Sequence, residues 1–98
     1  MSLDAGRVPQ PLVPLLPLAE KWGSGDDLER SSRVERASNE QLLELLEAVN
    51  RCQNELFDWL AGPESYSADP TKEYIAFSDL AAAFDYAKVL LRRRKDRL

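Results

Sequence analysis

The sequence of 98 residues contains no histidine and only one cysteine, Cys52. Histidine is the commonest general base and the commonest metal ligand in proteins, so other residues would have to fill both roles. One cysteine excludes an internal disulfide, and the two shortages together exclude a zinc site built from Cys and His within one chain. A catalytic cysteine would also lack the histidine that usually activates it. We therefore predict no cofactor and no metal site, and we predict that the protein is not an enzyme.

Long apolar runs are also missing, since none approaches the roughly 18 residues that cross a bilayer. The N-terminal run PLVPLLPLA imitates a signal peptide only weakly, because three prolines interrupt it and Asp4 stands where such a peptide is basic. The lack of disulfides fits a reducing compartment. We predict a cytoplasmic protein without membrane association.

The charge of the chain is unevenly distributed. Residues 1–91 carry 8 basic and 16 acidic side chains, a net charge of −8, whereas residues 92–98 carry 5 basic side chains and Asp96, a net charge of +4. An acidic body repels nucleic acid and attracts basic surfaces. The composition thus favours another protein as partner, in particular a basic one, and argues against nucleic acid.

A long amphipathic helix is predicted over residues 39–61. Ser38 and Gln41 match the spacing of a capping box at its start. From Leu42 to Trp59, apolar residues recur at alternating steps of three and four, which is the spacing of a heptad seam.

A second long helix is predicted over residues 70–95. Asp69 and Pro70 are typical of a helix start. The same alternating spacing of apolar residues runs from Phe77 to Leu91. The last turns carry the sequence RRRK, whose cations complement the negative end of the helix dipole.

Two shorter helices are predicted at residues 14–22 and 26–37, and residues 1–11 are predicted to form an extended or disordered arm before a single helical domain, residues 12–98. Because only a short connection joins the two long helices, we expect them to lie antiparallel. The predicted fold is therefore all-α, a four-helix arrangement dominated by a long antiparallel hairpin of the two C-terminal helices. The length of the seam also predicts a homodimer.

The candidate site residues are few. Asp26 and Asp27 start the second predicted helix, where carboxylates favour the positive end of the helix dipole. Metal binding there is the weaker interpretation, because the spacing of a calcium loop is absent. Between the long helices, Glu64, Ser65 and Tyr66 are not required by the turn. We predict these five residues as partner-binding positions, since aromatic side chains dominate binding hot spots.

Three segments, WGSGDD, WLAGPESYS and EYIAFSDLAAAFDYAK, together resemble a group of small bacterial proteins of unknown function. The resemblance covers residues 14–91. It implies a bacterial source, an acidic body and an all-α fold. It carries no catalytic motif and therefore implies no activity.

The sequence favours a small acidic protein–protein interaction module, such as an inhibitor or immunity-type protein that binds a basic partner. One alternative is a regulator that contacts nucleic acid through the basic C-terminal tail. A second alternative is an enzyme that depends on carboxylates or on a divalent metal ion.

Overall fold

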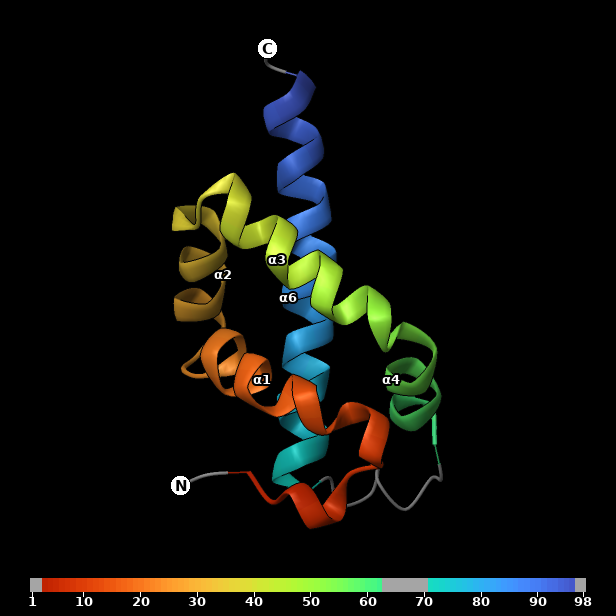
Figure 1. Ribbon diagram of the computed structural model, residues 1–98. Helices are drawn as coiled ribbons and strands as arrows, with labels where there is room; N and C mark the ends of the chain where they lie inside the picture. The colour runs from red at the N-terminus through yellow and green to blue at the C-terminus, as the bar shows by residue number, and fades with distance from the viewer. Residues whose placement is uncertain (1–2, 63–70, 97–98) are drawn as a thin grey trace.

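The computed structural model describes residues 3–62 and 71–96, and these residues form an all-helical structure (Figure 1). The all-α prediction is confirmed. The described elements are two short 3-10 helices, η1 (Ala5–Arg7) and η2 (Gln10–Leu15), followed by the α-helices α1 (Leu16–Gly23), α2 (Asp27–Arg36), α3 (Asn39–Arg51), α4 (Gln53–Leu60) and α6 (Lys72–Asp96). Of these helices, none combines the length and the apolar character that crossing a bilayer requires.

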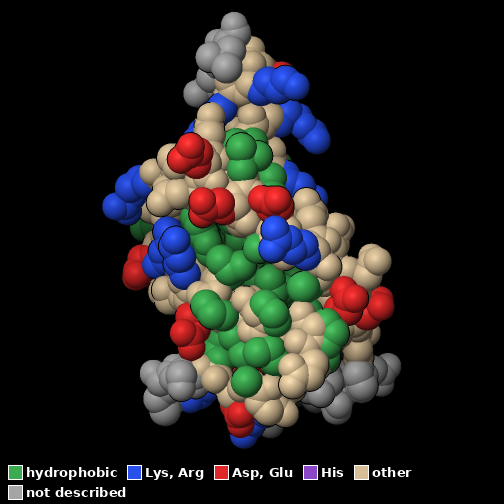
Figure 2. Space-filling model, in the orientation of Figure 1, with side chains coloured by type: hydrophobic (Ala, Val, Ile, Leu, Met, Phe, Trp, Pro, Cys, Tyr) green, Lys and Arg blue, Asp and Glu red, His purple; other side chains and the backbone are tan. Residues whose placement is uncertain are grey.

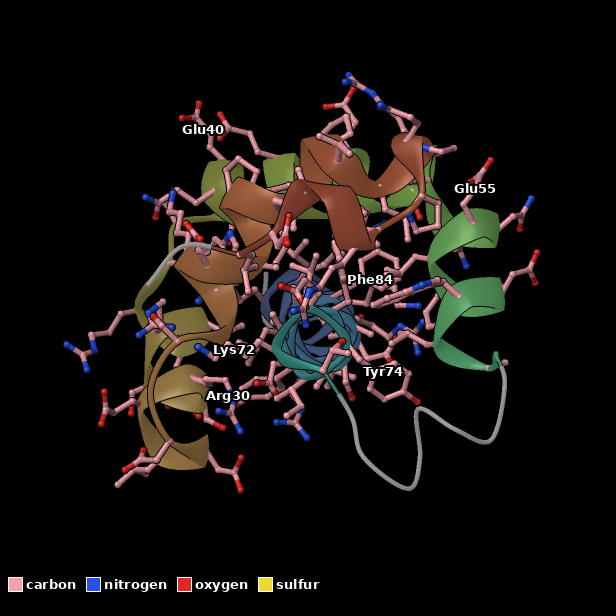
Figure 3. The ribbon with its side chains drawn as sticks, turned by 90° about the horizontal axis from the view of Figure 1, so that it is seen from below. Arg30, Glu40, Glu55, Lys72, Tyr74 and Phe84 are labelled. Atoms are coloured by element: carbon pink, nitrogen blue, oxygen red, sulfur yellow. The ribbon has the colours of Figure 1, made fainter. Side chains whose placement is uncertain are left out.

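Helix α6 is the central element of the fold. Seen along its axis in Figure 3, the other described helices surround it on three sides, with α1 and α3 on one side and α2 and α4 to either side. The face of α6 that meets them buries Phe77, Leu80, Phe84 and Ala87, as the spacing of these residues predicts. The start of α6 is capped by Thr71, whose hydroxyl accepts a hydrogen bond from the Tyr74 N–H at 3.1 Å.

The predicted hairpin of two long helices is not confirmed. In place of one helix over 39–61, the chain forms α3 and α4, separated by Cys52, whose backbone (φ −120°, ψ 17°) leaves the helical region. Figure 1 shows α3 crossing α6 obliquely, and α6 packs most extensively against α1. The predicted capping box of Ser38 and Gln41 is present at the start of α3.

Because the helix breaks at Cys52, its second half, α4, packs against the core in a different direction from α3. The Cys52 thiol donates a hydrogen bond to the Pro11 carbonyl of η2 at 3.1 Å. Beyond it, α4 contacts both η2 and α6. There the Trp59 ring meets Phe77 edge-on, with ring centroids 5.3 Å apart. A straight helix would carry these contacts away from α6, so tertiary packing overrides the local periodicity.

The N-terminal segment differs from the extended or disordered arm expected for residues 1–11. It contains η1 and the start of η2, and the side chains of Val8 and Leu12 are buried in the core. Two carboxylates hold its beginning, since Glu20 accepts the N–H of Leu3 and Glu73 accepts that of Asp4, both at 3.0 Å. Within residues 3–11, Val8 is therefore the residue that enters the core, while residues 4–7 and 9–11 are exposed.

The heptad seam that predicted a homodimer is used inside the chain. Leu42, Leu45, Val49 and Leu56 are buried in the core of the single copy. A second copy would therefore have to bind another surface.

Candidate functional site

The two predicted aspartates near the start of α2 have structural contacts. Asp26 is the N-cap of α2, and its carboxylate accepts the N–H of Glu29 at 2.8 Å. The side chain of Asp27 is 96% exposed and pairs with Arg30. In the parts of the chain that are described, no group of three or more metal-ligating side chains comes together. Asp26 thus acts as a helix cap, while Asp27 remains accessible to a partner.

The predicted residues Glu64, Ser65 and Tyr66 lie outside the described residues. The flanking aromatic residues have places in the structure. Trp59 packs against Tyr74, with ring centroids 5.6 Å apart, and the Tyr74 hydroxyl donates a hydrogen bond to the Leu60 carbonyl at 2.8 Å. These two aromatic side chains join α4 to α6, so their principal role is packing.

One arginine of the basic tail is part of the fold. Arg94 donates hydrogen bonds to the carbonyls of Glu35 and Ala37, at 3.0 and 3.1 Å, and to the side-chain oxygen of Asn39 at 2.7 Å. The two carbonyls belong to the C-terminal end of α2, where helix carbonyls lack partners within the helix and a cation is favoured. Arg92, Arg93 and Lys95 are exposed. The tail therefore combines one structural cation with a solvated group.

Asp79 lines a pocket of about 360 Å³ between α2 and α6. Figure 3 shows Arg30 between α2 and α6. Its guanidinium lies 3.6 Å from the Asp79 carboxylate and 2.6 Å from the Gly25 carbonyl. Burial raises the pKa of Asp79, and Asp27 raises it further, while Arg30 acts in the opposite direction. Asp27 also lines this pocket, but its side chain is 96% exposed, so the two carboxylates do not form a buried pair.

We expect Asp79→Asn to be more stable than the unmodified protein at pH 7. Because folding raises the pKa of Asp79 above 3.8, the folded state favours the protonated carboxyl. Its stabilising contribution is complete below pH 3.8 and is lost as the pH rises through the raised pKa. Urea unfolding at pH 7 and pH 3 should therefore show a gain at pH 7 that disappears at pH 3. The matched variant Asp85→Asn, at an exposed position on the same helix, should show no such gain, and an equal gain from both variants would contradict the assignment.

Glu73 is a buried carboxylate that the sequence did not mark as special. It is 3% exposed, and its Oε1 accepts the Asp4 N–H while its Oε2 has no hydrogen-bond partner. Burial of an unpaired carboxylate oxygen opposes folding. The hydrogen bond from the Asp4 N–H to Glu73 joins the N-terminal segment to α6, and this contact is the structural role of Glu73.

The most extensive apolar area in view lies over η2, α1 and α3. Figure 2 shows hydrophobic side chains gathered there, with acidic side chains over α3 and basic ones toward α2. Among the apolar residues of these elements that are exposed or only half-buried are Val13, Pro14, Pro17, Leu18 and Ala48. We call the surface formed by these five residues the α1/α3 face. Clustered uncovered apolar residues bordered by polar groups are typical of interaction surfaces.

A basic pocket of about 570 Å³ adjoins this face. Its lining includes three cations but only one carboxylate, Glu29, and at its edge Leu28 is 75% exposed. The cations are Lys21, Arg33 and Arg36. A positively charged pocket on an acidic body is unexpected from the net charge, and it suits an acidic group of a partner.

An acidic stripe runs along the exposed side of α3. Glu40, Glu44 and Glu47 follow the spacing i, i+4, i+7 and are all exposed. Leu43, which is 55% exposed, lies among them. Gln41 on the same helix lines the basic pocket, so the stripe and the pocket adjoin each other.

Sequence patterns did not identify the basic pocket, because its cations come from α1 and α2, and only packing brings them together. The acidic stripe did have a sequence signal, the regular spacing of three glutamates.

Comparison of the chain with protein-family models, curated proteins and solved structures finds no match.

Proposed function

We propose that the protein is a small acidic protein–protein interaction module that acts through the α1/α3 face. The observation that carries the proposal is the group of apolar side chains left uncovered over η2, α1 and α3, with charged groups on its borders. The net charge of −8 on residues 1–91 supports a basic protein as partner, since charge complementarity speeds association. An inhibitor or immunity-type protein is the specific form of this function.

A photo-crosslinking amino acid at Pro17 tests the proposal, because this exposed residue lies on the α1/α3 face. In an extract of the cells that make the protein, we expect covalent adducts heavier than the free chain. Their yield should fall as the salt concentration rises, since salt screens exposed charges. The matched control carries the crosslinker at Asp85, an exposed position on α6. No adduct from position 17, or equal adducts from both positions, would contradict the proposal.

A further inference from the structure

The basic pocket and the acidic stripe contain charges that have no opposite charge beside them. Among the described residues, Lys21 and Arg36 form no ion pair, and neither do Glu40 and Glu44. Lys21 lies 5.5 Å from the centre of the Trp22 ring instead. These groups are available to a partner without the loss of an internal ion pair.

The two areas have opposite charge and similar construction. Each contains an exposed leucine, Leu28 beside the cations and Leu43 among the glutamates, and these are the two most exposed large hydrophobic residues of those described. The helix that carries the stripe also contributes Gln41 to the pocket. One surface of the molecule therefore displays both halves of a complementary pair.

We propose that a second copy of this chain binds the α1/α3 face, with the acidic stripe of each copy on the basic pocket of the other. The proposal rests on the proposed function because it uses the same surface, and a basic protein that binds the α1/α3 face would compete there with the second copy. Figure 2 shows the acidic and basic side chains bordering the apolar area on one face. A twofold axis in the plane of the interface, running between the two charged areas, brings each stripe to the partner's pocket and apolar area to apolar area.

Twofold symmetry repeats each contact, so a single complementary pair is used twice. In the dimer, Lys21 and Arg36 of one copy face Glu40 and Glu44 of the other. The exposed leucines and the uncovered apolar residues leave water together, which supplies the non-directional part of the binding free energy. A chain of 98 residues has a high ratio of surface to volume, so the burial also stabilises each copy.

Charge exchange tests the dimer. One variant combines Lys21→Glu with Arg36→Glu, and the other combines Glu40→Lys with Glu44→Lys. In sedimentation velocity, we expect the unmodified chain to reach twice 11.1 kDa as its concentration rises. Each variant alone should dimerise at least about tenfold more weakly, because like charges then face each other. An equimolar mixture should recover the dimer, because both contacts become complementary again in the mixed pair.

The matched control combines Glu55→Lys with Asp58→Lys, which reverses two exposed acids on α4 away from the pocket and should leave dimerisation unchanged. Circular dichroism should show that all variants are folded. The proposal is overturned if the unmodified chain stays at 11.1 kDa into the millimolar range, or if the mixture fails to recover the dimer. If the chain is monomeric but still forms adducts from position 17 with another protein, the dimer proposal is contradicted and the proposed function is not. A chain that forms no adduct there would contradict the proposed function as well.

Discussion

Leu12→Ala is expected to lower the free energy of unfolding by about 3 kcal/mol, the size of loss seen when a buried leucine is truncated. Leu12 is 0% exposed, although it follows directly on a segment expected to be extended or disordered. Its side chain belongs to the same core as Phe77 and Phe84 of α6. Urea unfolding, followed by far-ultraviolet circular dichroism, measures the change.

Two matched variants make this result specific. Val13→Ala alters the next residue, which is only half-buried, and should cost less than about 1 kcal/mol. Leu12→Val removes less volume and should cost about 1 kcal/mol, so the effect stays measurable even if the alanine variant is poorly folded. If Leu12→Ala unfolds at the same urea concentration as the unmodified protein, the Leu12 side chain does not belong to the core.

Arg94→Met should lower the free energy of unfolding by about 2 kcal/mol, because it removes three hydrogen bonds from a charged donor. Two of the acceptors are carbonyls at the C-terminal end of α2, which would lose their partner. The unbranched methionine side chain replaces the apolar stem of arginine but lacks the guanidinium, so the change isolates that group. Hydrogen exchange should show the larger loss of protection in α2 and at the start of α3.

Arg94→Lys should recover less than half of the loss, since an ammonium group cannot reproduce the planar fork that reaches several acceptors at once. The matched control is Arg92→Met, which removes an exposed cation two residues earlier and should change stability by less than about 0.5 kcal/mol. Equal losses from Arg92→Met and Arg94→Met would show that the net charge of the tail matters and that the contacts with α2 do not.

The helical elements were largely predictable because their signals are local. The capping box of Ser38 and Gln41, the apolar spacing of α6 and the acidic cap of α2 each depend on residues within a few positions of one another. Such signals reflect backbone hydrogen bonds and side-chain neighbours within one or two turns. They predicted where most of the helices form, and they predicted the burial of Phe77, Leu80, Phe84 and Ala87 on α6, although not that of Glu73.

The candidate site was predictable only in part. The spacing of Glu40, Glu44 and Glu47 places them on one side of a helix, so the acidic stripe has a local cause. The basic pocket depends on how α1 and α2 pack together, and no local pattern reports that. Asp26 stands where a carboxylate suits a helix cap as well as a site; the structure shows the cap, and the partner contact stays a prediction.

The sequence by itself determined an all-α chain with an acidic body, because helix periodicity, capping and charge are properties of neighbouring residues. Only the tertiary structure decided that the seam breaks at Cys52 and that Val8 of the N-terminal segment is buried. It also decided that Arg94 caps α2 from the far end of the chain. The physical reason is that core packing and cap satisfaction join residues distant in sequence, and their free energy exceeds the weak local preferences that a pattern can report.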